Sequence, residues 1–512
     1  MKERFEMVAK TFQGLEEILA EELRGLGAED VEPGLRMVSF MGDKETLYRA
    51  NMCCRTALRV LKPFYKFYAN SPDELYERSK EFDWSSILGP DKTFQVDTVA
   101  NSEEISHSRY ATYRVKDAIC DWFKERYGDK RPRVSTSDPD IIINLHISGD
   151  RVTLSLDSSG ESLHKRGYRI SQTDAPINEV LAAGIILKSG WRGEKPFIDP
   201  MCGSGTFVIE AALIAANINP GVFRSKFAFE KWRDFDAEIF DNIYNDDSKE
   251  KEITVPIIGS DISPKAINIA QRNVKSARVH NMVTLEVKSL SDWNEAPANG
   301  VLVTNPPYGE RLNYEHLNDL YALLGTKLKH VFKGYHAWII GYRDEHFAKI
   351  GLAPSIKLPL LNGSLECKLQ EYIIFEGTKR DFRKSGGELK KDAKSRKEIQ
   401  AKNDRRRTPG ERFKKAFDNY NVKRDRQEDR ASRPQKGRRS DDKRGLSREK
   451  NGSERPRMEI GGMFIGRQPK LPPQEGSIMR DRRAGWKKRP EWFKSNESNL
   501  EESQSKQNKT DE

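Results

Sequence analysis

The sequence has few cysteines and no cysteine motif. Its five cysteines are Cys53, Cys54, Cys120, Cys202 and Cys367, and no two of them form a C-x-x-C pair. Cys53 and Cys54 are neighbours in the chain, and such neighbours seldom form a disulfide with each other. Neither a disulfide scaffold nor a metal site is therefore expected, and a reducing compartment is the simplest inference.

The sequence also lacks long apolar runs. No segment approaches the roughly 20 apolar residues that cross a bilayer as a helix. Residues 1–23 mix lysine, arginine and glutamate and contain no apolar core of a secretory signal. We therefore expect a cytoplasmic protein with no membrane partner.

The first 377 residues have no net positive charge, and the excess of basic residues lies in the remainder. Residues 378–512 hold 41 Lys and Arg and 23 Asp and Glu, a net charge of +18, out of totals of 89 and 78. Residues 1–377 therefore carry 48 basic and 55 acidic residues, a net charge of −7. Aromatic and branched residues also become too sparse beyond Gly377 to offset chain entropy. We expect 378–512 to be a disordered basic tail with electrostatic, nonspecific affinity for nucleic acid.

Two small α/β modules are predicted before residue 160. Residues 5–8 and 31–40 have strand patterns, with a turn at Pro33-Gly34, while 14–23 and 44–51 have helical spacing. This alternation favours a ferredoxin-like domain over residues 1–64. Strand patterns at 93–99, 141–147 and 152–156, with a helical pattern at 110–127, predict a second module over 65–159.

A third α/β region is predicted over residues 160–377. Its first helix is expected over 174–187, with Pro176 in the first turn, where a missing N–H costs nothing. Residues 195–212 then predict a short strand, a glycine-rich turn and an apolar helix. Gly203 and Gly205 allow the backbone to approach a ligand, and the free N–H groups of the helix start favour a carboxylate. A dinucleotide motif would need a third glycine at Val208, so that fold is disfavoured.

A second strand of this region, within 255–261, ends in the carboxylate of Asp261. A carboxylate at that place can accept both hydroxyls of a cofactor ribose. The alternative is helix capping, because Asp261 and Ser263 both precede a predicted helix. Capping by Ser263 and ligand binding by Asp261 are compatible. Further strands are expected at 283–287, 301–304, 336–341, 355–361 and 365–375.

The strand at 301–304 stops abruptly at Asn305-Pro306-Pro307-Tyr308, because proline cannot donate to a strand ladder. An exocyclic base amine is a poor nucleophile until acceptors hold both of its hydrogens. The Asn305 side-chain carbonyl and the Pro306 backbone carbonyl can be those acceptors, and Tyr308 offers a flat face for a base. The alternative is a rigid loop that only closes the strand.

These motifs resemble, in order and spacing, the class I methyltransferases that use S-adenosylmethionine. In the amino-group enzymes of that family the Asn and first Pro hold the target amine and the aromatic residue stacks on the base. Those roles fall on Asn305, Pro306 and Tyr308, with Pro307 completing the motif. The resemblance also assigns a set of cofactor-binding residues: Asp199, Pro200, Gly203, Ser204, Gly205, Thr206, Asp261 and Ile262.

One position departs from the family pattern. Ser289 stands where an acid usually contacts the cofactor adenine, and Asp292 follows three residues later. The resemblance still places Ser289 in the cofactor site, but it leaves the adenine contact open.

The stretch from Leu154 to Arg169 resembles the junction between a THUMP domain and the catalytic domain of THUMP-containing RNA methyltransferases. Its sequence is LSLDSSGESLHKRGYR. His164, Lys165, Arg166 and Arg169 would suit an RNA backbone that passes between the two modules. The alternative is a solvated, charged connector with no ligand.

The resemblance covers about residues 1–377 and predicts an α/β protein. The ferredoxin-like and THUMP modules come first. A Rossmann-like class I methyltransferase domain with a mostly parallel seven-stranded sheet follows them. It implies S-adenosyl-L-methionine as cofactor and RNA as substrate. Ribosomal RNA is expected first and tRNA second, and the whole pattern is most similar to bacterial enzymes that methylate guanine N2 in 23S ribosomal RNA. Adenine N6 of RNA or DNA, and a non-catalytic ribosome-assembly factor, remain alternatives. The sequence does not indicate the oligomeric state.

Overall fold

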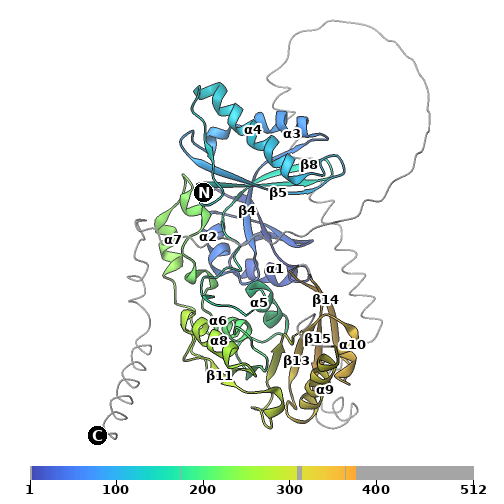
Figure 1. The fold of residues 1–512 in the computed structure, drawn as a ribbon. Coiled ribbons are helices and arrows are strands. Elements are labelled where there is room, and N and C mark those ends of the chain that lie inside the picture. Colours follow the sequence, from blue (N-terminus) through green and yellow to red (C-terminus); the bar gives the residue numbers. More distant parts are fainter. Residues whose placement is uncertain (1–2, 174–175, 308–313, 364, 376–512) are drawn as a thin grey trace, which may run out of the picture. The chain divides into compact units, whose positions relative to one another are not determined.

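The structure is a computed structural model that describes residues 3–173, 176–307, 314–363 and 365–375. These residues belong to one contact unit, within 1–421. Two predictions, the stacking residue Tyr308 and the tail 378–512, lie outside the described residues. Two mixed sheets, each covered by helices, organise the described chain (Figure 1).

The first sheet has eight strands in the order β2-β3-β1-β4-β8-β7-β5-β6. Alternating side chains point into the core, because fully buried and half-buried residues alternate along β7 and β3. Helices α3 and α4 pack side by side on the part of the sheet that contains β5 (Figure 1). The elements are β1 Phe5–Lys10, α1 Glu16–Gly25, β2 Glu29–Gly34, β3 Met37–Gly42, α2 Lys44–Cys53, β4 Arg59–Tyr68, α3 Pro72–Lys80, η1 Trp84–Ser86, β5 Thr93–Asn101, α4 Ser108–Tyr127, β6 Arg133–Val134, β7 Ile141–Ser148 and β8 Arg151–Asp157.

The predicted modules 1–64 and 65–159 share this sheet. Strand β4 pairs with β1 at one edge and with β8 at the other, from Leu61 opposite Asp157 to Tyr68 opposite Arg151. The predicted boundary between residues 64 and 65 therefore falls inside β4. The turn expected at Pro33-Gly34 is also displaced, because both residues belong to β2 and the left-handed residue is Arg36, with φ of 57°.

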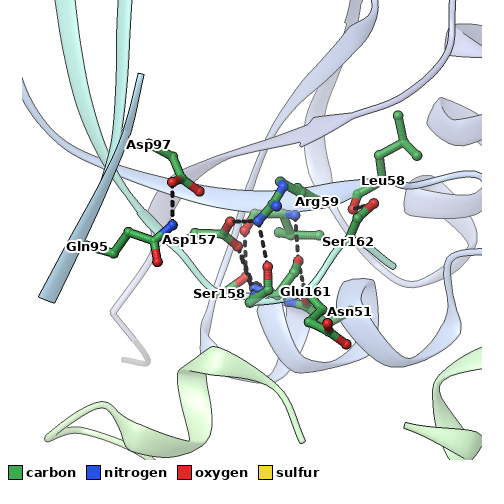
Figure 2. Close-up of polar contacts among 12 residues, drawn as sticks. Asn51, Leu58, Arg59, Gln95, Asp97, Asp157, Ser158, Glu161 and Ser162 are labelled. Atoms are coloured by element: carbon green, nitrogen blue, oxygen red, sulfur yellow. Dashed lines mark hydrogen bonds and ion pairs between the residues drawn. The ribbon is translucent and has the colours of Figure 1, made fainter. Parts of the chain in front are cut away.

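The chain leaves the first sheet at the end of β8 through a network of polar contacts (Figure 2). Arg59 on β4 donates to the Asp157 carboxylate and to the Gly160 carbonyl. The hydroxyl of Ser158 donates to Val60 O at 2.7 Å, and Asn51 Nδ2 on α2 donates to Ser158 Oγ at 2.8 Å. The start of the connector is therefore fixed to the first sheet.

The second sheet has seven strands in the order β11-β10-β9-β12-β13-β15-β14. The pairs from β11 to β13 are parallel, and β15 runs antiparallel to both neighbours. The elements are α5 Glu179–Lys188, β9 Phe197–Asp199, α6 Thr206–Ala215, η2 Pro220–Phe223, η3 Ala228–Lys231, α7 Ala237–Tyr244, β10 Ile257–Asp261, α8 Pro264–Ser276, β11 Thr284–Val287, η4 Leu290–Asp292, β12 Val301–Thr304, α9 Tyr314–His330, β13 His336–Gly341, α10 Asp344–Lys349, β14 Ile356–Asn362 and β15 Leu365–Ile373.

The central elements of this sheet are apolar and enclosed. Every residue of β9, β12 and α6 is buried, as expected for parallel strands covered on both faces. Helix α5 begins at Glu179, and Asn178 caps it by accepting from Val180 N at 3.0 Å. The expectation of a helix from residue 174 with Pro176 in its first turn is therefore wrong. Asn178 provides the cap.

The third region also contributes to the core of the first sheet. The ring of Phe229 stacks on Tyr48 of α2 with centroids 4.4 Å apart, and Phe240 of α7 packs against the same ring. Helix α7 lies beside α2 (Figure 1). All five cysteines are free, and no helix in the described part of the chain is long and apolar enough to span a membrane.

Candidate active site

A cavity of about 640 Å³ opens at the carboxyl edge of the second sheet. The strand order reverses between β9 and β12, which are paired neighbours followed by helices on the two faces. Open α/β sheets bind ligands at such a reversal. The lining includes most residues predicted for the cofactor and the amine: Asp199, Pro200, Gly203, Ser204, Thr206, Asp261, Ile262, Ser289, Asn305, Pro306 and Pro307.

The glycine-rich turn joins β9 to α6 on one wall of this cavity. Gly203 and Gly205 have φ of 53° and 81°, in the left-handed region that favours glycine. Gly205 N donates to Cys202 O at 2.8 Å, and Gly205 precedes the first residue of α6. The turn thereby sets the direction of the free backbone N–H groups at the start of α6. Such N–H groups favour the binding of a ligand carboxylate. Gly205 is not among the residues that line the cavity, and its part in cofactor binding stays a prediction.

Asp261 ends β10 and contacts the glycine-rich turn directly. Its Oδ2 accepts from Gly203 N at 3.0 Å, and its Oδ1 accepts from Ser263 N at 2.9 Å. Ser263 caps α8 through Ala266 N, so capping and the carboxylate belong to different residues. Each carboxylate oxygen keeps a further lone pair that can accept a hydroxyl proton. Asp261 can therefore hold a ribose while it fixes the turn.

Asp199 ends β9 and is 1% exposed. Its Oδ1 accepts from Thr304 Oγ1 on β12 at 2.9 Å and from Met201 N at 3.2 Å. Burial raises the pKa of this carboxyl to about 7, with the Asp261 charge adding to the rise and the two hydrogen bonds opposing it. Asp199 thus joins the two strands at the reversal and can change charge near neutral pH.

Asn305 follows β12 and lines the same cavity. Its side-chain oxygen Oδ1 is buried and has no hydrogen-bond partner among the described residues. A buried carbonyl without a donor costs about 1–3 kcal/mol, and a bound donor would remove that cost. Pro306 and Pro307 line the cavity beside it.

Ser289 lines the cavity but offers a hydroxyl where an acid was usual in the resembled family. It caps η4, accepting from Ser291 N at 3.3 Å, while Asp292 Oδ2 accepts from Ser289 N at 3.3 Å. Asp292 therefore bends back onto the cap and is not a lining residue.

The four residues predicted to contact RNA line a second cavity, of about 790 Å³. Lys165 is exposed and pairs with Glu161 at 2.9 Å. His164 is half-buried, its Nδ1 lies 2.8 Å from Ser162 Oγ, and burial lowers its pKa. An RNA contact by Lys165 and His164 stays a prediction.

The structure encloses the guanidinium of Arg166. Arg166 is 2% exposed, donates to the carbonyls of Leu163 and Arg55, and lies 3.6 Å from Glu210 of α6. Tyr168 donates to the same Glu210 at 2.8 Å. The guanidinium is thus held in a buried ion pair with Glu210. An RNA contact by Arg166 stays a prediction.

Arg169 is also mostly enclosed, with 14% of its side chain exposed. It donates to Glu179, Ser204, Ile177 and Thr206, and it therefore holds the glycine-rich turn. Its role in RNA binding stays a prediction.

Some lining residues had no signal in the sequence. The stretch before α5 lines both cavities through Gln172, Pro176 and Ile177. Lys226 and Lys231 reach the second cavity and both pair with Asp138. Only the packing of distant segments brings these residues together.

Comparison with known proteins identifies the modules. Family models match residues 6–61 as an RlmL ferredoxin-like domain, 69–157 as a THUMP domain and 166–371 as an RMKL-like methyltransferase domain. A Synechocystis protein named among the RNA methyltransferases is 37% identical over 370 residues, which cover 72% of this chain and 96% of that protein. The chain belongs to the RMKL-like methyltransferase family.

Other RMKL-like relatives are longer. The ribosomal RNA large subunit methyltransferase K/L of Syntrophotalea carbinolica is 42% identical over 378 residues, which cover 71% of this chain and 53% of that enzyme. The chain thus spans about half the length of the K/L relatives it matches. A methyltransferase solved with SAH, SMU.472, aligns with a TM-score of 0.67 and 33% identity over 74% of this chain and all of that one.

The cofactor of this RMKL-like protein is S-adenosyl-L-methionine. The residues present fit it. A turn that presents helix N–H groups suits its carboxylate, and the ionisable Asp199 suits its positive charge. Bound there, the cofactor supplies an electrophilic methyl group on a sulfonium sulfur. The precise contacts of the individual residues remain proposals.

Proposed function

We propose that this protein transfers the methyl group of S-adenosylmethionine to the N2 amine of a guanine in 23S ribosomal RNA. The observation that carries the proposal concerns Asn305, which lines the cofactor cavity. Its side-chain oxygen Oδ1 is buried and has no hydrogen-bond partner among the residues that the structure describes. An amide oxygen in that position lacks only a donor, and an exocyclic amine is such a donor.

In this mechanism Asn305 Oδ1 accepts one amine hydrogen and the Pro306 carbonyl accepts the other. Holding both hydrogens turns the nitrogen lone pair towards the methyl group. Transfer of the methyl group to that nitrogen would form a carbon–nitrogen bond in exchange for the cofactor's carbon–sulfur bond, with a neutral thioether as the leaving group and the positive charge on the amine. The amine loses one proton to solvent. Catalysis is mainly positioning, so no strong general base is required.

A base must leave its helix or loop to reach this cavity. Tyr308, next in the chain after Pro307, is proposed as its stacking partner. The RNA strand on either side would lie against the second cavity, where Lys165 is exposed and His164 is half-buried. The THUMP match at 69–157 and the names of the K/L relatives support RNA, and large-subunit ribosomal RNA in particular. Action on ribosomal RNA would place the protein in the cytoplasm.

The same geometry would accept adenine N6, and tRNA is a second candidate substrate. A non-catalytic assembly factor is disfavoured, because such a protein has no reason to keep a buried oxygen without a donor at the cofactor cavity.

The test is a methylation assay with the full chain and isotope-labelled S-adenosylmethionine. The substrates are 23S ribosomal RNA and large subunits from a strain that lacks the gene, with tRNA and DNA in parallel. Nucleosides from each reaction are separated by chromatography and identified by mass spectrometry. Labelled N2-methylguanosine from 23S RNA is expected. Labelled N6-methyladenosine would overturn the choice of base, and no label in any substrate would overturn catalysis.

A further inference from the structure

Arg169 occupies a position between the two cavities. It lines the second cavity, whereas two of its acceptors, Ser204 and Thr206, line the cofactor cavity. Arg169 Nη1 donates to Ser204 Oγ at 3.0 Å, and Nη2 donates to Thr206 Oγ1 at 2.9 Å. The guanidinium therefore binds the hydroxyls of both residues that flank Gly205, and Arg169 itself is not among the residues that line the cofactor cavity.

The other donors of Arg169 fix the guanidinium in place. Nε donates to Glu179 Oε1 at 2.6 Å, and Nη2 also donates to Ile177 O at 3.1 Å. Glu179 is the first residue of α5 and is 4% exposed. A planar fork held by a buried carboxylate presents its remaining N–H groups in one fixed direction.

Asn273 of α8 holds the same turn from another side. Its Nδ2 donates to Ser204 O at 3.0 Å and to Ser171 O at 2.8 Å, while its Oδ1 accepts from the amides of Ile170 and Ser171. Asn273 is 1% exposed. The segment that follows Arg169 is therefore attached to the glycine-rich turn at two separate points.

We propose that Arg169 is a positioning residue that sets the glycine-rich turn for the cofactor without touching the cofactor. It fixes the two hydroxyls that flank Gly205, and through them the direction of the amide groups at the start of α6. Because Arg169 lies where the connector after β8 enters the methyltransferase domain, this contact fixes the first residues of that domain to the cofactor site. The inference rests on the proposed function only in taking the 640 Å³ cavity as the cofactor site.

The experiment measures the affinity of the full chain for S-adenosylhomocysteine by calorimetry, together with kcat and KM for S-adenosylmethionine. Arg169→Gln should raise both the dissociation constant and the cofactor KM roughly tenfold, the change expected when a charge-assisted bond of about 1.4 kcal/mol is lost. The kcat at saturating cofactor should change by no more than about threefold. Arg169→Lys keeps the charge but not the fork, so an intermediate loss is expected.

A double-mutant cycle separates positioning from general destabilisation. If Arg169 acts through Ser204, then Ser204→Ala and Arg169→Gln should not be additive, and the double variant should bind about as weakly as Arg169→Gln alone. Additive losses would overturn the proposal. If Arg169→Gln is unstable because Glu179 is left unpaired, the Arg169→Gln/Glu179→Gln variant removes both charges and serves in its place.

Arg224→Gln is the matched control. Arg224 is also a buried arginine at the second cavity, and it donates to the carbonyls of Ser159, Glu161, Ser162 and Lys165 in the connector. None of these bonds reaches the glycine-rich turn, so cofactor affinity should be unchanged. An equal loss in both variants would show a general effect of the connector and overturn the special role of Arg169.

Asp261→Ala distinguishes a failure of the positioning role of Arg169 from a failure of the cofactor site itself. If Asp261→Ala weakens binding and Arg169→Gln does not, the positioning role fails while the cofactor site stands. If neither variant weakens binding, the cofactor site itself is wrong, and the positioning role falls with it.

Discussion

Replacing Asp199 with asparagine should make the stability of this protein less dependent on pH. Asparagine keeps the Oδ1 acceptor that receives the Thr304 hydroxyl and the Met201 amide, but it cannot ionise. In the folded chain burial raises the Asp199 pKa from 3.8 to about 7. The folded state therefore holds a proton that the unfolded chain releases between about pH 4 and pH 7, so Asp199 lowers the free energy of unfolding as pH rises through that window.

The size of the effect follows from the shift. A rise of about three pKa units corresponds to an upper figure of about 4 kcal/mol at 1.36 kcal/mol per unit. Asp199→Asn and the parent chain should have similar stability near pH 4. The variant should then become the more stable of the two as pH approaches 8, by an amount of that order.

The assay is thermal unfolding of both proteins at pH 5, 6, 7 and 8 in matched buffers, scored as the difference between their midpoints. Comparing the two proteins cancels the titration of every other carboxylate. A difference that does not grow between pH 5 and pH 8 would refute the claim that Asp199 is forced to ionise in a buried site. Cofactor affinity supplies a second check, because the positive cofactor should favour the ionised form. Affinity should rise with pH in the parent chain and be weaker and flat in Asp199→Asn.

Three further predictions concern other parts of the chain. Asp261→Ala should raise the cofactor dissociation constant roughly 10- to 100-fold, the loss expected for charge-assisted hydrogen bonds of about 1.5–3 kcal/mol; unchanged affinity by calorimetry would remove Asp261 from the site. Truncation after Gly377 should leave the unfolding midpoint nearly unchanged and flatten the salt dependence of RNA affinity while preference for target RNA survives; a salt titration that shows an unaltered slope would contradict it. Gly167→Ala should destabilise the fold by several kcal/mol, because Gly167 has φ of 108° and a Cβ would lie 2.1 Å from Phe223 O. Denaturant unfolding measures this change, and a free energy of unfolding within about 1 kcal/mol of the parent value would be incompatible with this packing.

The sequence predicted the elements that form the cofactor cavity. Strands β9, β10 and β12 could be located because each begins with apolar residues and is short: β9 and β10 end at Asp199 and Asp261, and Asn305 directly follows β12. Parallel strands buried on both faces leave this signature without any tertiary information. The seven-stranded, mostly parallel sheet and the modules before it are confirmed.

The shared strand β4 could not be predicted from its pattern. Pro63 interrupts it, and proline usually marks the end or edge of a strand. In the structure the register between β4 and β8 shifts between Pro63 and Tyr65, so the strand continues past the proline. The eight-stranded sheet depends on this pairing, which joins residues about 90 positions apart in the chain.

The burial of Arg166 was hidden because His164-Lys165-Arg166 has the composition of an exposed connector. Its partner Glu210 lies in the apolar helix α6, more than 40 residues further along the chain. That lone acid was the available signal, because a carboxylate buried among apolar residues requires a cation or donors. The sequence could indicate that a partner exists, but only the fold identifies which arginine it is.

The most direct measurement of the central claim compares Asn305→Ala with the parent chain in two assays on the same protein sample. Calorimetry with S-adenosylhomocysteine measures cofactor binding, and transfer of labelled methyl groups to 23S ribosomal RNA measures catalysis. Because Asn305 Oδ1 is proposed to receive the target amine, the account predicts cofactor affinity within a few fold of the parent and methyl transfer lost by several orders of magnitude. Equal loss of binding and transfer in a folded variant, or transfer that survives, would contradict it.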